Sequence, residues 1–288
     1  MIYNKRPVKW NETDRDVHSV TWLSPSDYAA SMAALAESHP EKIKRAGEAS
    51  WCDQSGQNVS GFLSDVKSGG TVRHADAIRK AAEGVKVPAF RLYGETVALG
   101  VGPGVPIIPA VLAGVPEHNL TLDNGVDVST PLRVVFDRTS SGGLNAGQVE
   151  RAGAAVAAFV EIAQASRPVE VWVLCNTGAD GDSNACSMRL KLSPHASQAE
   201  LGLYVVGLGA IRRGMYGFAS AHHGFFHNWP FRSHDTDSSS IVCSSDLLTD
   251  TDIFIGPMHY SHPLIQDPAR WIEESLSKAF QGVAERES

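Results

Sequence analysis

The chain has 288 residues, 43% of them hydrophobic and 20% charged, and its formal net charge is -7. This composition is that of a folded protein with one large core or two smaller ones, and it excludes disorder as the default state. The negative charge gives no general attraction to nucleic acid, and the lack of a signal-peptide pattern or of about 18 consecutive apolar residues predicts a cytoplasmic protein without a membrane partner.

Residues 1–125 are predicted to form a smaller, irregular α+β N-terminal region of unknown role, with short helical patterns between scattered tryptophans and glycines. Ser24, which a proline follows, is a suitable N-cap for a helix that runs to Ala36. A second, shorter helix is predicted from Ala75 to Glu83, ending at Gly84. We expect both helices to belong to this region rather than to the domain that follows.

A glycine-rich run from Val97 to Pro116 superficially resembles a phosphate-binding loop. Its glycines, at positions 100, 102 and 104, do not follow the Gly-x-Gly-x-x-Gly spacing of a dinucleotide fingerprint. The prolines at positions 103, 106 and 109 also disfavour the helix that such a loop must open. We therefore interpret the run as an extended apolar segment that packs on the next domain.

The remainder of the chain has a regular pattern that predicts an α/β domain. Leu132–Phe136 is a continuous apolar run, typical of strands buried on both faces, and Asp137 lies at its carboxyl end. Asn145 and Gln148 have the spacing of a capping box at the start of a helix. Val169–Cys175 is a second buried strand, so the three elements form a βαβ unit with parallel strands and a right-handed crossover.

Further elements complete this domain. Apolar and polar residues alternate over Ser187–Leu192, which is typical of an edge strand and predicts antiparallel pairing with the strand before it. A helix is predicted over Gln198–Tyr216, a buried strand over Asp252–Gly256 and an amphipathic helix over Pro268–Phe280. The four cysteines are too scattered for a disulfide framework, and Cys175 is expected to be a small buried apolar residue.

The loop Asp137-Arg138-Thr139-Ser140-Ser141 and this order of elements resemble a von Willebrand factor A-type domain. The resemblance implies a three-layer Rossmann-like fold with a mixed, mostly parallel sheet over residues 126–288. It also implies a divalent cation, Mg²⁺ or Ca²⁺, held by Asp137, Thr139 and Ser141, because carboxylate and hydroxyl oxygens suit these ions.

One observation leaves another interpretation of this loop open. The family places a later ligand, an aspartate, where residues 252–256 here lead into Pro257-Met258-His259. Asp137 and Ser141 could instead cap the turn and the helix N-terminus by accepting backbone N–H bonds.

More broadly, the chain resembles an uncharacterised family of phage-encoded proteins. The resemblance rests on the Asp137 loop and on three apolar motifs, PAVLAGVPEH from Pro109, RAGAAVAAFV from Arg151 and RPVEVWV from Arg167. It implies a phage origin and a location in the host cytoplasm, and it implies no activity. Val242–Leu247 resembles the translation of a common sequencing-adapter end, so no function is assigned to it.

Two weaker motifs resemble metal-binding sites. Residues 180–184 have the Asp-x-Asp-x-Asn start of a calcium loop, but Ala185 replaces its glycine, so a hairpin turn is the favoured interpretation. His223 and His227 have the spacing of a helical zinc pair, without the glutamate of a metalloprotease. A packed aromatic loop explains these histidines equally well, because phenylalanines and a tryptophan surround them.

Two functions follow as hypotheses. The first is a protein-binding or assembly module of phage origin, with or without the assistance of a cation, which presents the Asp137 loop to an unknown protein partner. The alternative is a metal-dependent hydrolase that acts on phosphate esters and uses Asp137, His223 and His227. The enzyme requires these three side chains to converge in one cleft, whereas the binding module requires only a shallow loop.

Overall fold

The computed structural model describes residues 1–10, 13–47, 58–86, 97–100, 105–106, 119–122, 131–140, 143–165, 167–177, 185–222, 247 and 253–284. Within them lies a six-stranded sheet, whose strands in spatial order are β1 (Ile2–Trp10), β2 (Thr13–Trp22), β8 (Ala185–Lys191), β7 (Val169–Thr177), β6 (Leu132–Asp137) and β9 (Ile253–Ile255). Three of its five neighbouring pairs are parallel, namely β2 with β8, β7 with β6, and β6 with β9. The prediction of a mixed, mostly parallel α/β sheet is therefore confirmed.

A smaller antiparallel sheet lies in the glycine-rich part of the chain. It consists of β3 (Val97–Gly100), β5 (Asn119–Leu122) and β4 (Val105–Pro106), in that spatial order. The extended backbone of β3 and β4 agrees with the prediction made for this run.

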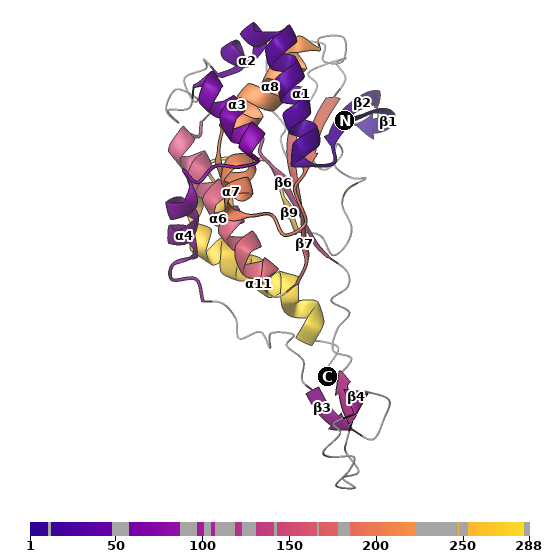
Figure 1. The fold of residues 1–288 in the computed structure, drawn as a ribbon, viewed down its shortest axis with the longest axis vertical. Helices are drawn as coiled ribbons and strands as arrows, with labels where there is room; N and C mark the ends of the chain where they lie inside the picture. The colour runs from indigo at the N-terminus through magenta and orange to yellow at the C-terminus, as the bar shows by residue number, and fades with distance from the viewer. Residues whose placement is uncertain are drawn as a thin grey trace.

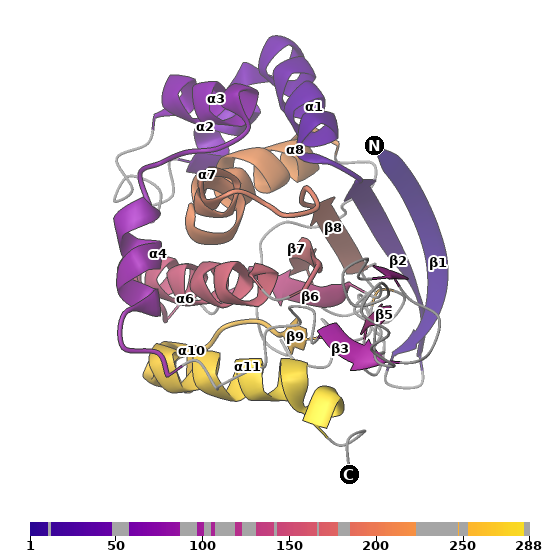
Figure 2. The same ribbon diagram turned by 60° about the horizontal axis from the view of Figure 1, so that its bottom comes forward.

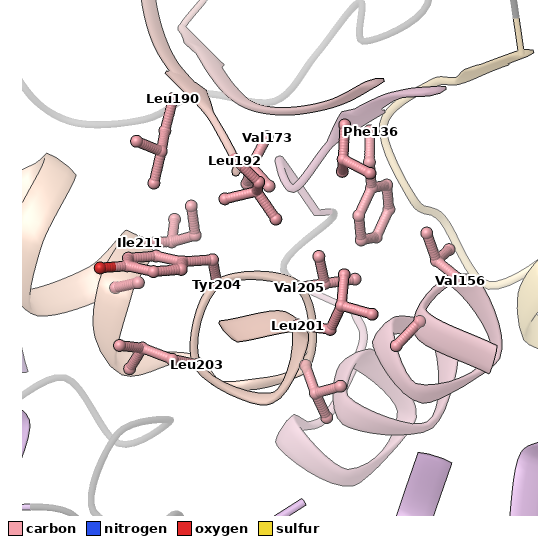
Figure 3. Close-up of a cluster of buried hydrophobic side chains, with 14 of the residues drawn as sticks. Phe136, Val156, Val173, Leu190, Leu192, Leu201, Leu203, Tyr204, Val205 and Ile211 are labelled. Atoms are coloured by element: carbon pink, nitrogen blue, oxygen red, sulfur yellow. The ribbon is translucent and has the colours of Figure 1, made fainter. Parts of the chain in front are cut away.

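The helices gather beside one face of the six-stranded sheet (Figure 1) (Figure 2). They are α1 (Pro25–Ser38), α2 (Pro40–Gly47), α3 (Val59–Ser68), α4 (Ala75–Ala82), α6 (Ala146–Gln164), α7 (Gln198–Leu201), the π-helices η2 (Gly202–Val206) and η3 (Ala210–Met215), α8 (Tyr216–Ala221), α10 (Pro263–Gln266) and α11 (Pro268–Ala284). Their buried side chains form one apolar core with the sheet strands. Figure 3 shows Phe136 and Val173 of the sheet lying opposite Val156 of α6 and Val205 of η2.

The helix starts follow local rules that the sequence displays. Ser24 Oγ accepts the N–H of Asp27 at 3.1 Å and caps α1 as predicted. Asn145 and Gln148 form both bonds of the predicted capping box at the start of α6. The predicted pairings of β6 with β7 and of β7 with β8 are also confirmed.

The edge position predicted for β8 is wrong. Strand β2 pairs with it in parallel, so β8 lies in the interior of the sheet. Two of its polar side chains are buried rather than exposed, namely Ser187 at 0% and Arg189 at 3% exposure. Arg189 Nε donates to Ser187 Oγ at 2.9 Å. The alternation of polar and apolar residues therefore reflects a second, polar buried face and not solvent.

The N-terminal elements belong to the same core as the rest of the molecule. Strands β1 and β2 extend the sheet, and buried side chains of α1 to α4 join the common apolar cluster. Within the described residues, position 125 therefore does not separate two cores. The three-layer arrangement of a von Willebrand A-type domain stays a prediction, because the described helices supply one layer only.

The single helix predicted over residues 198–216 is interrupted. Short α and π segments replace it, with a break at Gly207 and Leu208 between η2 and η3. Tyr28 Oη donates to the carbonyl oxygen of Ala210 at 2.6 Å, and a Cβ added to Gly214 would lie 1.5 Å from that hydroxyl oxygen. A side chain that enters the helix in this way competes for backbone hydrogen bonds, which accounts for the π geometry of η3.

Candidate functional site

The candidate site begins with Asp137, the last residue of β6. Its side chain is fully buried, and both carboxylate oxygens accept hydrogen bonds. Oδ1 accepts the N–H of Thr139 at 2.8 Å, and Oδ2 accepts the side-chain amide of Asn176 at 2.7 Å. The first bond closes a turn within the loop, and the second joins the ends of two parallel strands.

Thr139 completes this network from the other side. Its hydroxyl donates to the carbonyl oxygen of Asn176 at 2.9 Å and accepts the N–H of the same residue at 3.1 Å. Its own carbonyl oxygen accepts the N–H of Met258 at 2.9 Å, and Ser140 forms a parallel bridge with Met258. The loop after β6 is thus fixed to the carboxyl ends of both β7 and β9.

The structure brings together two of the three predicted ligands and adds a residue that sequence reasoning missed. Asp137 and Thr139 share one network, whereas Ser141 lies outside the described residues. Asn176 was overlooked, although it follows the predicted strand Val169–Cys175 directly and lies at the edge where ligands of parallel sheets bind. The Asp137 carboxylate caps the turn, as the second interpretation of the sequence predicts.

These contacts do not favour a cation at Asp137 and Thr139. Each carboxylate oxygen faces an N–H donor, and the threonine hydroxyl makes two bonds to Asn176. Within the described part of the chain, no three His, Cys, Asp or Glu side chains are grouped so that they could hold a metal. His223, His227 and residues 180–184 lie outside that part.

Arg138 connects the loop to the helical layer. Its side chain is 3% exposed. The guanidinium donates to the carbonyl oxygens of Val205, of Val206 at 3.2 Å and of Gly207 at 3.1 Å. A cation is favoured at the carbonyl end of a helix, so Arg138 stabilises the end of η2 where the chain breaks. Gly153 of α6 permits this contact, since a Cβ there would lie 2.7 Å from Arg138 Nη1.

The residues after β9 form the exposed part of the site, which we call the β9 loop (residues 258–262). Tyr260 is 70% exposed, whereas Met258 is fully buried. His259 Nδ1 lies 2.8 Å from Ser261 Oγ. His262 Nδ1 accepts the N–H of Leu264 at 3.1 Å and caps α10.

Comparisons of the chain with protein-family models, with curated proteins and with solved structures gave no match. Among the helices that the structure describes, none is long and apolar enough to cross a membrane.

Proposed function

We propose that the chain is a protein-binding or assembly module of phage origin, which presents the carboxyl edge of a von Willebrand A-like sheet to a protein partner. The strand order β8-β7-β6-β9, with β8 antiparallel and the others parallel, supports such a core. Ligands of open α/β sheets bind beyond the carboxyl ends of parallel strands, where the Asp137 loop and the β9 loop meet.

The observation that carries the proposal is the closed network of Asp137, Thr139 and Asn176, which is joined through Met258 to the loop that carries the exposed Tyr260. The network fixes the loop after β6 to the strand ends, and the Met258 bonds extend that support to the β9 loop. Tyr260 then projects from a supported backbone. Exposed aromatic side chains on rigid supports are frequent anchors of protein interfaces, since they bury a large area at little entropic cost.

The partner contact can be tested with a photocrosslinking amino acid at position 260. We expect it to capture a discrete protein from the host cytoplasm, and Tyr260→Ser should weaken binding of that purified partner at least about tenfold. The matched control is position 23, where Leu23 is 49% exposed at the end of β2. Equal capture from both positions, or unchanged affinity of the Tyr260→Ser protein, would contradict the proposal.

A cation-assisted version of the proposal, with Mg²⁺ or Ca²⁺ at the Asp137 loop, predicts a different result. It requires the cation to raise the melting temperature of the parent chain and not that of Asp137→Ala. The contacts of Asp137 favour the opposite outcome, in which Mg²⁺, Ca²⁺, Mn²⁺ and Zn²⁺ all leave the parent unchanged. Asp137→Asn is the matched control, because it removes the charge while it keeps the shape of the side chain.

A further inference from the structure

The ring of His74 packs along η2, the helix whose last carbonyls Arg138 holds. A Cβ added to Gly207 would lie 3.5 Å from His74 Nε2, and a Cβ added to Gly202 would lie 3.7 Å from His74 Cβ. The histidine therefore lies beside η2 near both its first residue and the break that follows it. His74 precedes α4 but makes no side-chain cap bond there.

Backbone contacts tie the segment before α4 to the same helical region. The N–H of Thr71 donates to the carbonyl oxygen of Ala199 at 2.8 Å. A Cβ on Gly70 would lie 2.6 Å from the carbonyl carbon of Ala199, and a Cβ on Gly202 would lie 2.6 Å from the carbonyl oxygen of Thr71. No side chains lie between these two backbones. A displacement of His74 is therefore expected to move the backbone of the segment that precedes α4.

The charged groups around His74 come from three elements. Arg138 faces it from the loop after β6, Arg73 from its own segment and Asp65 from α3. Burial lowers the pKa of His74, both arginines lower the pKa further, and Asp65 acts in the opposite direction. From α6, Glu150 lies in the field of the same Arg138 guanidinium. The neutral ring is thus the form that fits beside η2.

We propose that protonation of His74 is an acid-sensitive switch, in which a second positive charge beside Arg138 releases residues 69–82 from the end of η2. Arg138 already donates to the last two carbonyls of η2 and to the carbonyl of Gly207, so a protonated His74 would compete with its guanidinium for the same acceptors. Release of this segment uncovers the Arg138 contacts and loosens the loop that begins at Asp137. The switch needs no partner protein, so it can be tested separately from the proposed function.

The test is amide hydrogen exchange of the full-length chain between pH 7.5 and 5.5, corrected for the intrinsic rates. We expect protection over residues 69–82 and 202–207 to fall by up to about tenfold in the parent, mostly between pH 6.5 and 5.5, because stability coupled to one proton changes by at most about tenfold per pH unit below the ordinary histidine pKa of 6.5. In His74→Gln, whose side chain stays neutral, protection should remain constant across this range. His74→Asn is a second neutral variant, to be used if the first does not fold.

The matched control is His222→Gln. Burial and His39 also lower the pKa of His222, but this residue lies at the end of α8 and not beside Arg138. The control should therefore show the same loss of protection over residues 69–82 as the parent. No loss in the parent would overturn the proposal, as would an equal loss in the His74→Gln protein.

Discussion

At the scale of single residues, two buried tyrosines meet edge to face, with ring centres 5.6 Å apart. Tyr28 Oη donates to the carbonyl oxygen of Ala210 at 2.6 Å. Tyr204 Oη is buried, and among the described residues it has no hydrogen-bond partner. One hydroxyl therefore stabilises the fold, whereas the other has lost its solvation without a replacement bond.

This difference predicts opposite effects of the same substitution. Tyr28→Phe should lower the free energy of unfolding by about 0.5–1.5 kcal/mol, because it removes a buried bond. Tyr204→Phe should leave the free energy of unfolding unchanged or raise it, since it removes only an unsatisfied hydroxyl. Urea denaturation of both variants measures the difference. This account would be contradicted if Tyr204→Phe lowered the free energy of unfolding as much as Tyr28→Phe does.

Glu150, on α6, makes stability depend on pH. Burial raises its pKa from an ordinary value of 4.5, and Arg138 lowers the pKa only in part. Between 4.5 and the raised pKa the folded protein binds more protons than the unfolded chain, so the contribution of Glu150 to stability falls as the pH rises through this window. Above the window the half-buried charge remains destabilising.

Glu150→Gln should therefore unfold with a higher free energy than the parent at pH 7, with a flatter dependence on pH above 4.5. Urea denaturation at several pH values between 4.5 and 7.5 measures both effects. Glu83→Gln is the control, because Glu83 is exposed just after α4. If the free energy of unfolding of Glu150→Gln depends on pH as steeply as that of the parent over this range, burial does not raise the pKa of Glu150 as inferred.

At the scale of elements, the crossing of α6 over η2 depends on one glycine. A Cβ at Gly153 would lie 2.4 Å from the carbonyl oxygen of Val205 and 2.8 Å from Val206 Cα. Both contacts are with backbone, which cannot move aside as a side chain can. By contrast, the nearest atom to a Cβ at Gly147 of the same helix is Asn145 Oδ1, at 3.5 Å.

The two glycines are a matched pair for substitution. Gly153→Ala should lower the free energy of unfolding by about 1–3 kcal/mol, because it overpacks the crossing of α6 and η2. Gly147→Ala should raise it by roughly 0.5–1 kcal/mol, because alanine is the better helix former and the site has room. Thermal and urea denaturation measure both changes. If both variants have a higher free energy of unfolding than the parent, η2 can move away from α6, which would contradict this account.

At the scale of the whole molecule, the first 125 residues are expected to be indispensable for folding. They place six fully buried side chains in the common core, namely Trp22, Tyr28, Met32, Ile43, Phe62 and Ile78. At roughly 1.5–3 kcal/mol for each buried side chain, their loss is comparable to the whole stability of a typical domain, about 5–15 kcal/mol. Strand β2 also covers the side of β8 that would otherwise be an open edge.

Residues 126–288 alone should therefore fail to unfold cooperatively. Circular dichroism during heating and binding of a hydrophobic dye measure this, with the full-length chain as the control. A sharp transition without dye binding in the fragment would instead establish an independent domain with a boundary near residue 125.

The sequence by itself determined the elements whose causes are local. The N-caps Ser24 and Asn145 and the apolar runs of β6 and β7 lie where the pattern predicted them, since caps and strand runs act over a few residues. The position of Asp137 at the end of β6 follows for the same reason. Its role as a turn cap was one of two open interpretations.

Tertiary structure alone decided the features that join distant parts of the chain. Strand β8 is interior because β2, far away in sequence, pairs with it. The helix after residue 198 breaks where Arg138 takes the carbonyl of Gly207, and it has π geometry where the hydroxyl of Tyr28 takes the carbonyl of Ala210. No local signal within the helix encodes those donors. Asn176 joins the site only because β6 and β7 end side by side. Long-range contacts of this kind depend on which surfaces meet, and a pattern read along the chain does not contain that information.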